Sequence, residues 1–262
     1  MKWFLLLLLL AVPVLPRLRA EANAASTPPP ARPPQMPPPW SAGIFVATDS
    51  QPYRGAGGQS RILPFLSYRS ARLDWYGPFL RARVAEAGPL ILQARGQWDF
   101  GAYEASDAPI LEGLGNRRDT LLLGAGVETR FPSPWQLHAS LDRDVLGRHE
   151  GTEALAGLRR RIGSPRAPLS GSLSAGLRWQ DRRWTEDRVG VPESKAREDR
   201  PAYDPGSSLH PFVGGLVLYR ISPRWATTLG IRYEWLDDTW RDSPLVSDRG
   251  RLTSMLTLSA SF

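Results

Sequence analysis

Most of the chain beyond residue 40 alternates between apolar and polar residues, the pattern of β-strands with two unlike faces. The alternation is most regular in residues 90–100, 169–180, 225–236 and 251–262. In the last of these, Leu252, Leu256 and Leu258 share one face, while threonine, serine and arginine occupy most of the other. The sequence therefore predicts an all-β protein.

The number of strands follows from the same pattern. Strands are expected at 41–48, 61–69, 72–76, 79–85, 90–100, 120–131, 135–145, 152–162, 169–180, 212–221, 225–236 and 251–262. An even number of strands is typical of bacterial outer-membrane barrels, because both ends of the chain lie on the same side. Twelve strands are predicted; ten is the alternative if the first region packs inside or beside the barrel.

The connections between these strands alternate in length. Residues 132–134, 163–165 and 222–224 are short, whereas 101–119, 181–210 and 237–248 are long, polar and charged. Short periplasmic turns opposite long external loops are typical of outer-membrane proteins. We therefore expect a closed antiparallel transmembrane β-barrel. The loop at 181–210 is expected to be solvated, with arginines that contact anionic lipopolysaccharide.

Aromatic residues gather near the predicted strand ends, where a barrel crosses the two membrane interfaces. The expected girdle is Trp98, Phe131, Trp135, Trp179, Trp225 and Trp235, with Phe100 on the same apolar face. Phe262 ends the closing strand, and we expect it to serve as a signal for the barrel assembly machinery.

Charged residues occupy the polar face at mid-strand and are predicted to face the lumen. The candidates are Arg81, Arg83, Arg95, Glu128, Arg130, Asp142, Arg178, Arg232 and Glu234. Two interpretations remain open: a compensated ion-pair network that fills a narrow lumen, or an arginine-lined pore that selects small anions by its field.

The amino-terminal segment predicts export. Lys2 precedes an apolar run that is too short to span a bilayer, and small residues around Ala24 suit a cleavage site. We expect a signal peptide at 1–24, with cleavage after Ala20 as the alternative, a proline-rich periplasmic linker at 25–40, and the barrel at 41–262. The expected location is the outer membrane of a Gram-negative bacterium.

Composition argues against several other classes. The chain has 33 basic and 26 acidic residues, interleaved along its length, and this distribution predicts no nucleic-acid partner. It has no cysteine and only three scattered histidines, so no metal or cofactor site is expected. His138, Ser140 and Asp142 share a strand face, but residues two apart lie about 6–7 Å from each other. That spacing is too long for a nucleophile–base hydrogen bond, and no catalytic residue is predicted.

Several short motifs carry a family resemblance. They are Pro-Ala-Tyr-Asp-Pro-Gly at 201–206, Asp-Ser-Pro-Leu-Val at 242–246, Arg249-Gly250, Leu63-Pro64 and Tyr68-Arg69. With them, residues 41–262 resemble the MipA/OmpV family of outer-membrane proteins, also called MltA-interacting proteins. The proline-rich segment before residue 41 departs from that pattern.

The resemblance implies an outer-membrane barrel without catalytic residues. In some members it also implies a scaffold that links a lytic murein transglycosylase to a penicillin-binding murein synthase. Other members are porin-like or related to adhesion. The expected function is therefore the scaffold, and the alternatives are a narrow anion channel or a surface adhesion protein.

Overall fold

The computed structural model describes residues 39–262, apart from 102, 130–133 and 165–166. Contacts within the chain separate residues 1–36 from 37–262, and the second unit is the one described below. The predicted signal peptide, nearly all of the predicted linker, Arg130 and Phe131 lie outside the described residues.

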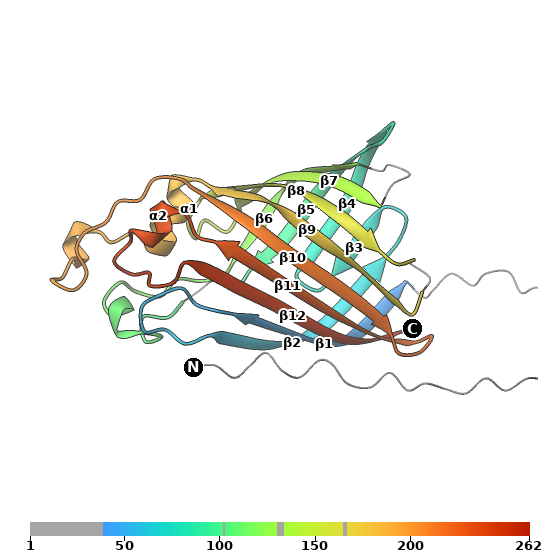
Figure 1. Ribbon diagram of the computed structural model, residues 1–262, viewed down its shortest axis with the longest axis horizontal. Coiled ribbons are helices and arrows are strands. Elements are labelled where there is room, and N and C mark those ends of the chain that lie inside the picture. Colours follow the sequence, from blue (N-terminus) through green and yellow to red (C-terminus); the bar gives the residue numbers. More distant parts are fainter. Residues whose placement is uncertain (1–38, 102, 130–133, 165–166) are drawn as a thin grey trace, which may run out of the picture. The chain divides into compact units, whose positions relative to one another are not determined.

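Residues 40–261 supply twelve strands that form one closed barrel (Figure 1). The strands are β1 (Trp40–Asp49), β2 (Gln59–Arg69), β3 (Leu73–Tyr76), β4 (Phe79–Ala87), β5 (Leu90–Asp99), β6 (Thr120–Thr129), β7 (Trp135–Asp144), β8 (Thr152–Ile162), β9 (Leu169–Gln180), β10 (Ser208–Arg220), β11 (Trp225–Trp235) and β12 (Gly250–Ser261). Each strand pairs antiparallel with its neighbours in sequence, and β12 closes onto β1. The prediction of a closed antiparallel barrel with twelve strands is confirmed.

The strand register assigns one face of every strand to the outside. Residues directly opposite each other in an antiparallel pair share a face. Ile44 lies opposite Leu258 and Pro64, and Ile44 and Leu258 are 54% and 43% exposed. Their neighbours Phe45 and Thr257 are also paired, and they are buried on the other side. The exposed apolar face is therefore the outer surface, and the largely polar face lines the lumen.

The register also shows which side chains of β2 point into the barrel. Phe65 points inward and is 3% exposed, whereas Ile62 points outward and is 74% exposed. Its neighbour β3 has only four residues, and β3 and β4 meet in a turn at Gly77. Gly77 has a φ of 54°, a left-handed conformation that glycine adopts without strain.

The long connections gather at one end of the barrel, called here the long-loop end (Figure 1). They include two short helices, α1 (Arg182–Val189) and α2 (Asp238–Arg241), and two 3-10 turns, η1 (Pro109–Leu111) and η2 (Glu193–Lys195). Asp181 caps α1, since its side chain accepts a hydrogen bond from the Trp184 backbone N–H at 2.9 Å. No helix among the described residues is long and apolar enough to cross a membrane.

These connections pack on one another to form a cap, defined here as residues 50–58, 100–119, 145–151, 181–207 and 236–249. The cap contains a hydrophobic core of its own, formed by Tyr53, Tyr103, Ala108, Ile110, Leu111, Leu114, Val189, Val191, Leu236, Trp240, Leu245 and Val246. The core draws on four separate connections, so each loop buries apolar side chains that it could not bury alone. Burial of this kind is the main favourable term in folding.

The expectation of a solvated loop at 181–210 holds for part of the segment, since residues 192–199 are all exposed. Trp184 and Val189 are buried, however, and so are Arg188 and Arg200, at 3% and 1% exposure. For the buried part, the charged composition misled because hydrogen bonds to backbone carbonyls offset much of the cost of burying an arginine. Arg200, for example, donates to the backbone carbonyls of Ile110 and Glu112 at 2.6 and 2.8 Å.

The other end of the barrel carries only short connections and is called here the short-turn end. The hairpin between β4 and β5 projects there beyond its neighbours (Figure 1). Its residues 83–90 are all exposed, including Val84 at 64% and Leu90 at 45%.

Candidate functional site: the lumen and its cap

The tryptophans proposed for the membrane interfaces all point outward. Trp98, Trp179 and Trp235 lie toward the long-loop end, and Trp135 and Trp225 begin their strands at the short-turn end. Each of the five is 37–47% exposed. Arg160, which also points outward, lies over the Trp135 ring at 5.4 Å. Their role at a membrane interface stays a prediction, and Phe131 lies outside the described residues.

Phe100 does not share the outer face with them. Its ring lies 6.4 Å from that of Phe45, which points into the lumen, and the Arg61 guanidinium lies 5.4 Å above it. Arg61 also donates to the Phe100 carbonyl at 2.8 Å. The alternation breaks because β5 ends at Asp99, and a residue beyond the strand is no longer held to its two-residue period.

A buried ion-pair network lies on the inner face of the barrel just below the cap. Arg178 donates to Glu153 at 3.2 Å and also to Glu234, so it joins strands β8, β9 and β11. Glu153 and Glu234 are 4% and 3% exposed, and Arg178 is 8% exposed. Three charges that are so little exposed are tolerable only because they satisfy one another. Of the lumen candidates, Arg178 and Glu234 are therefore brought into direct contact.

Further ion pairs line the same half of the lumen. Arg95 lies 3.3 Å from Asp142, another contact between two residues proposed from the sequence. Arg251 donates through Nε to Asp49 at 2.8 Å, across the seam where β12 meets β1. This half of the lumen is thus filled by compensated charge.

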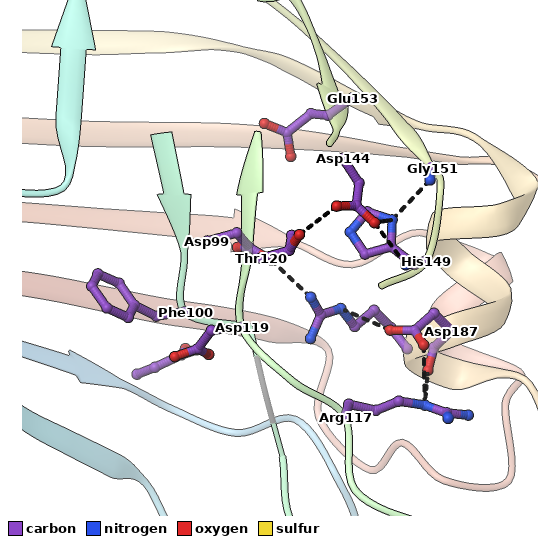
Figure 2. A network of polar contacts seen from close by, with 12 residues as sticks. Asp99, Phe100, Arg117, Asp119, Thr120, Asp144, His149, Gly151, Glu153 and Asp187 are labelled. Atoms are coloured by element: carbon purple, nitrogen blue, oxygen red, sulfur yellow. Dashed lines mark hydrogen bonds and ion pairs between the residues drawn. The ribbon is translucent and has the colours of Figure 1, made fainter. Parts of the chain in front are cut away.

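A third network ties the cap to the barrel wall. Asp144, at the end of β7, accepts hydrogen bonds from the Thr120 hydroxyl and from the backbone N–H of His149 (Figure 2). Figure 2 also shows Arg117 reaching Asp187, which it approaches at 3.2 Å. Arg117 lies in the 100–119 connection and Asp187 in α1, so the contact joins two parts of the cap.

His149 sits inside this network as a neutral base. Its Nδ1 accepts a hydrogen bond from the Gly151 backbone N–H at 2.9 Å, so that nitrogen carries no proton. Burial lowers the pKa of His149 below its ordinary value, and the nearby Arg188 guanidinium lowers it further. The Asp144 carboxylate, 4.0 Å away, raises the pKa of His149, but its effect is smaller than the lowering by burial and Arg188.

The cap closes the long-loop end tightly. Tyr53 donates to the Arg188 carbonyl at 3.2 Å, and Ser243 donates to the Val189 carbonyl at 2.7 Å, both within the protein interior. Burial raises the pKa of Tyr53 above its ordinary value, so its hydroxyl remains protonated. A cavity of about 10 Å³ between the cap and the wall, lined by Arg188, Trp240 and Arg251 among others, has room for about one water.

The lumen near the short-turn end has a different character. Arg81, Arg83 and Glu128 lie on the inner face there. Arg232 also points inward, but it lies toward the long-loop end of β11, 3.5 Å from Glu234. The side chain of Arg81 is 40% exposed although it points into the barrel, so solvent reaches this half of the lumen. The lumen is thus open toward the short turns and closed under the cap.

The outer surface of the cap carries a groove of about 730 Å³. Arg182 and Arg183 line it, and each is paired with an acid: Asp204 at 2.6 Å and Glu150 at 2.6 Å. Lipopolysaccharide contact through the arginines of 181–210 stays a prediction: Arg182, Arg183 and Arg197 are exposed, whereas Arg188 and Arg200 are buried. Among the described residues, no group of histidines and acids could hold a metal ion.

The family model of the MltA-interacting protein MipA matches residues 42–262, which is nearly the whole described barrel. This chain belongs to the MipA family. The predicted membership is confirmed, and the family makes this chain an outer-membrane β-barrel protein. No curated protein matches the chain significantly in sequence.

Solved structures resemble this MipA-family barrel only distantly. The COG4313 outer membrane channel from Pseudomonas putida F1 is 12% identical, with 89% of this chain and 100% of that chain covered and a TM-score of 0.43. The N-terminal β-barrel domain of Pseudomonas aeruginosa OprF is 11% identical, with coverage of 87% and 100% and a TM-score of 0.30. The outer membrane channel DcaP of Acinetobacter baumannii is 9% identical, with coverage of 85% and 96% and a TM-score of 0.33.

Sequence reasoning missed part of the lumen of this MipA-family barrel. Arg159 faces inward, opposite Gln136 and Ser174. Three consecutive arginines at 159–161 hid the alternation, since the middle one faces outward and its two neighbours face inward. The cap core was also missed, because its apolar residues come from segments with no regular period.

Proposed function

We propose that this protein is a non-enzymatic, non-conducting scaffold of the outer membrane, which recruits murein-processing enzymes at its short-turn end. In this proposal the short turns face the periplasm and the cap faces the exterior, as is usual for such barrels. The partners are a lytic murein transglycosylase, in keeping with the family name, and a penicillin-binding murein synthase.

The packed cap is the observation that carries the proposal. A conducting pore needs a continuous water path, but here Leu111, Val189 and Leu245 are fully buried at the long-loop end. Under them lie the buried charges of Arg178 and its two carboxylates. A barrel sealed in this way favours an anchoring role over a transport role.

The hairpin of β4 and β5 offers the contact surface that a scaffold needs. Val84 and Leu90 are exposed at its tip, and apolar side chains on a projecting hairpin are suited to a protein partner. Transglycosylase capture by the purified barrel tests this role. We expect Val84→Asp to weaken capture and Val145→Asp, which changes an exposed valine of the cap, to leave it unchanged. Equal capture by both variants would count against the hairpin.

Conductance in planar bilayers tests the sealed state. We expect the intact protein to show no stable openings at moderate voltage, because an ion would have to cross the cap core. Frequent, long-lived openings of the wild-type protein would overturn the non-conducting part of the proposal.

An anion channel is the second candidate, and one observation favours it. The inner face toward the short turns carries Arg81, Arg83 and Arg159, so an ion path through this half would favour anions. This function requires the cap to open. Anion-selective current that appears when the cap core is weakened, for example by Leu245→Ala, would support it.

A further inference from the structure

Two buried polar atoms on the inner face, in the middle of the barrel, have no hydrogen-bond partner among the described residues. They are Nδ1 of His138 and Oγ of Ser140. Nε of Arg95 lies beside them in an ion pair with Asp142 at 3.3 Å. Ser140 is 8% exposed, so water does not readily compensate its hydroxyl. Buried polar groups are normally hydrogen-bonded, and two such atoms at adjacent inward positions point to a ligand.

The register and two glycines place these side chains together. His138 and Ser140 are adjacent inward positions of β7, and Arg95 reaches toward them from β5 across β6. At Gly126 of β6, a Cβ would lie 2.8 Å from Cδ of Arg95 and 3.4 Å from Cβ of Ser140. At Gly157 of β8, a Cβ would lie 2.9 Å from Cε1 of His138. Glycine at both positions makes room for the side chains to converge.

Arginines gather around this cluster. Arg81, Arg95 and Arg232 each have an acidic partner, which is Asp74 at 2.9 Å, Asp142 at 3.3 Å and Glu234 at 3.5 Å. Arg159 is repelled by these three guanidinium groups and attracted by Glu128, but it forms no ion pair within 4 Å with any residue that the structure describes. The charge of Arg159 is therefore the least compensated in the cluster, and an added anion would compensate it.

We propose that His138, Ser140 and Arg159 bind an oxyanion, a carboxylate or a phosphate, inside the lumen. Arg159 can only donate hydrogen bonds, Ser140 can donate through its hydroxyl, and His138 can donate in the tautomer with a proton on Nδ1. The ligand therefore has to supply acceptor oxygens and negative charge. Arginine suits planar and tetrahedral oxyanions because its donors form a fork.

The ligand enters from the short-turn end. The side chain of Arg81 is 40% exposed on the inner face, so solvent reaches the lumen from that side, while the cap blocks the other. The site is thus reached from one end of the lumen only, which neither an ion-pair filler nor a conducting pore would require. It does not depend on the recruitment of murein enzymes.

Titration calorimetry on the folded, detergent-solubilised protein tests the site, with inorganic phosphate and citrate as probes at low ionic strength. Arg159→Gln removes the least compensated charge, and Arg160→Gln is its matched control, since Arg160 is the next residue and faces outward. We expect Arg159→Gln to weaken binding about tenfold, as the loss of a charged hydrogen bond would. Arg160→Gln should leave the affinity unchanged. Stronger binding of one probe identifies the ligand as phosphate or carboxylate.

Ser140→Ala provides a second variant that changes no charge and little volume. We expect it to weaken binding severalfold while heat-modifiable gel migration stays as in the wild type. The proposal fails if the wild type binds neither probe, or if Arg159→Gln and Arg160→Gln weaken binding equally. Murein-enzyme capture is measured separately, so the failure of either hypothesis leaves the other standing.

Discussion

Arg188 of α1 donates a hydrogen bond to the carboxylate of Asp99, the last residue of β5, at 2.8 Å. The side chains are 3% and 15% exposed, so the pair is shielded from water. It connects the helix at the centre of the cap to the wall of the barrel. The cap is thus fastened to the barrel by charge as well as by its apolar core.

Breaking this pair should loosen the cap without unfolding the barrel. Asp99→Asn leaves the Arg188 charge buried with less compensation, which typically costs about 3–5 kcal/mol. We expect faster proteolysis and hydrogen exchange in residues 181–207, with heat-modifiable migration of the barrel unchanged. Arg182→Gln, which breaks an exposed pair with Asp204, is the control and should have little effect. Unchanged exchange in Asp99→Asn would show that the apolar core alone holds the cap.

The cap core should decide whether the barrel is sealed. Leu245 is 0% exposed, and truncating a buried leucine to alanine costs about 2–5 kcal/mol. We expect Leu245→Ala to increase the frequency of channel openings in planar bilayers. Leu256→Ala removes the same atoms from an outward position that is 46% exposed, and it should leave conductance at the wild-type level.

The cap should also weaken in mild acid. The pKa of His149 is lowered in the folded protein, so its neutral form is favoured there, while the unfolded segment titrates near pH 6.5. Between the two pKa values, His149 is protonated in the unfolded segment but neutral in the folded cap. The cap therefore has its full stability above about pH 6.5 and loses stability as the pH drops below that value.

Hydrogen exchange of residues 145–151 between pH 7.5 and 5, corrected for intrinsic rates, measures this effect. The groups that face His149 are Arg188, Asp144, Asp187 and Asp99. His149→Asn keeps a side-chain acceptor for the Gly151 N–H without a titrating ring, and it should flatten the pH dependence. If hydrogen exchange in His149→Asn depends on pH as it does in the wild type, the pH dependence comes from the carboxylates instead.

Single-cysteine labelling should fix the orientation of the barrel. The chain has no cysteine, so Arg182→Cys in the cap and Ser222→Cys in a short turn each introduce a single thiol. We expect an impermeant maleimide to label intact cells through position 182 and not through position 222. The reverse pattern would place the cap in the periplasm and contradict the proposed scaffold.

Phe262 should matter for assembly. Its backbone N–H donates to the Trp40 carbonyl at 3.0 Å, at the seam between β1 and β12, and its ring is 67% exposed. We expect Phe262→Ala to lower the yield of heat-modifiable barrel in outer-membrane fractions more than Arg232→Gln does. Equal yields would show that the aromatic ring contributes little to barrel assembly.

The alternation of residues determined the barrel itself. Leu252, Leu256 and Leu258 predicted the outer face of β12, and the structure exposes them by 43–46%. This succeeds because a strand has a fixed period of two, and in a membrane barrel one face must be apolar. The same logic predicted that Arg95, Asp142 and Arg178 share the inner face, where the register places them.

Only the tertiary structure decided how the lumen is divided. Which arginine contacts which carboxylate depends on the register between neighbouring strands. Arg178, for example, forms ion pairs with both Glu153 and Glu234. The cap depends on apolar residues from distant connections, such as Tyr53, Leu111 and Leu245, and none of these segments has a period that reveals its partner. Sequence periodicity records the faces of single strands, whereas closure and burial arise from contacts between segments far apart in the chain.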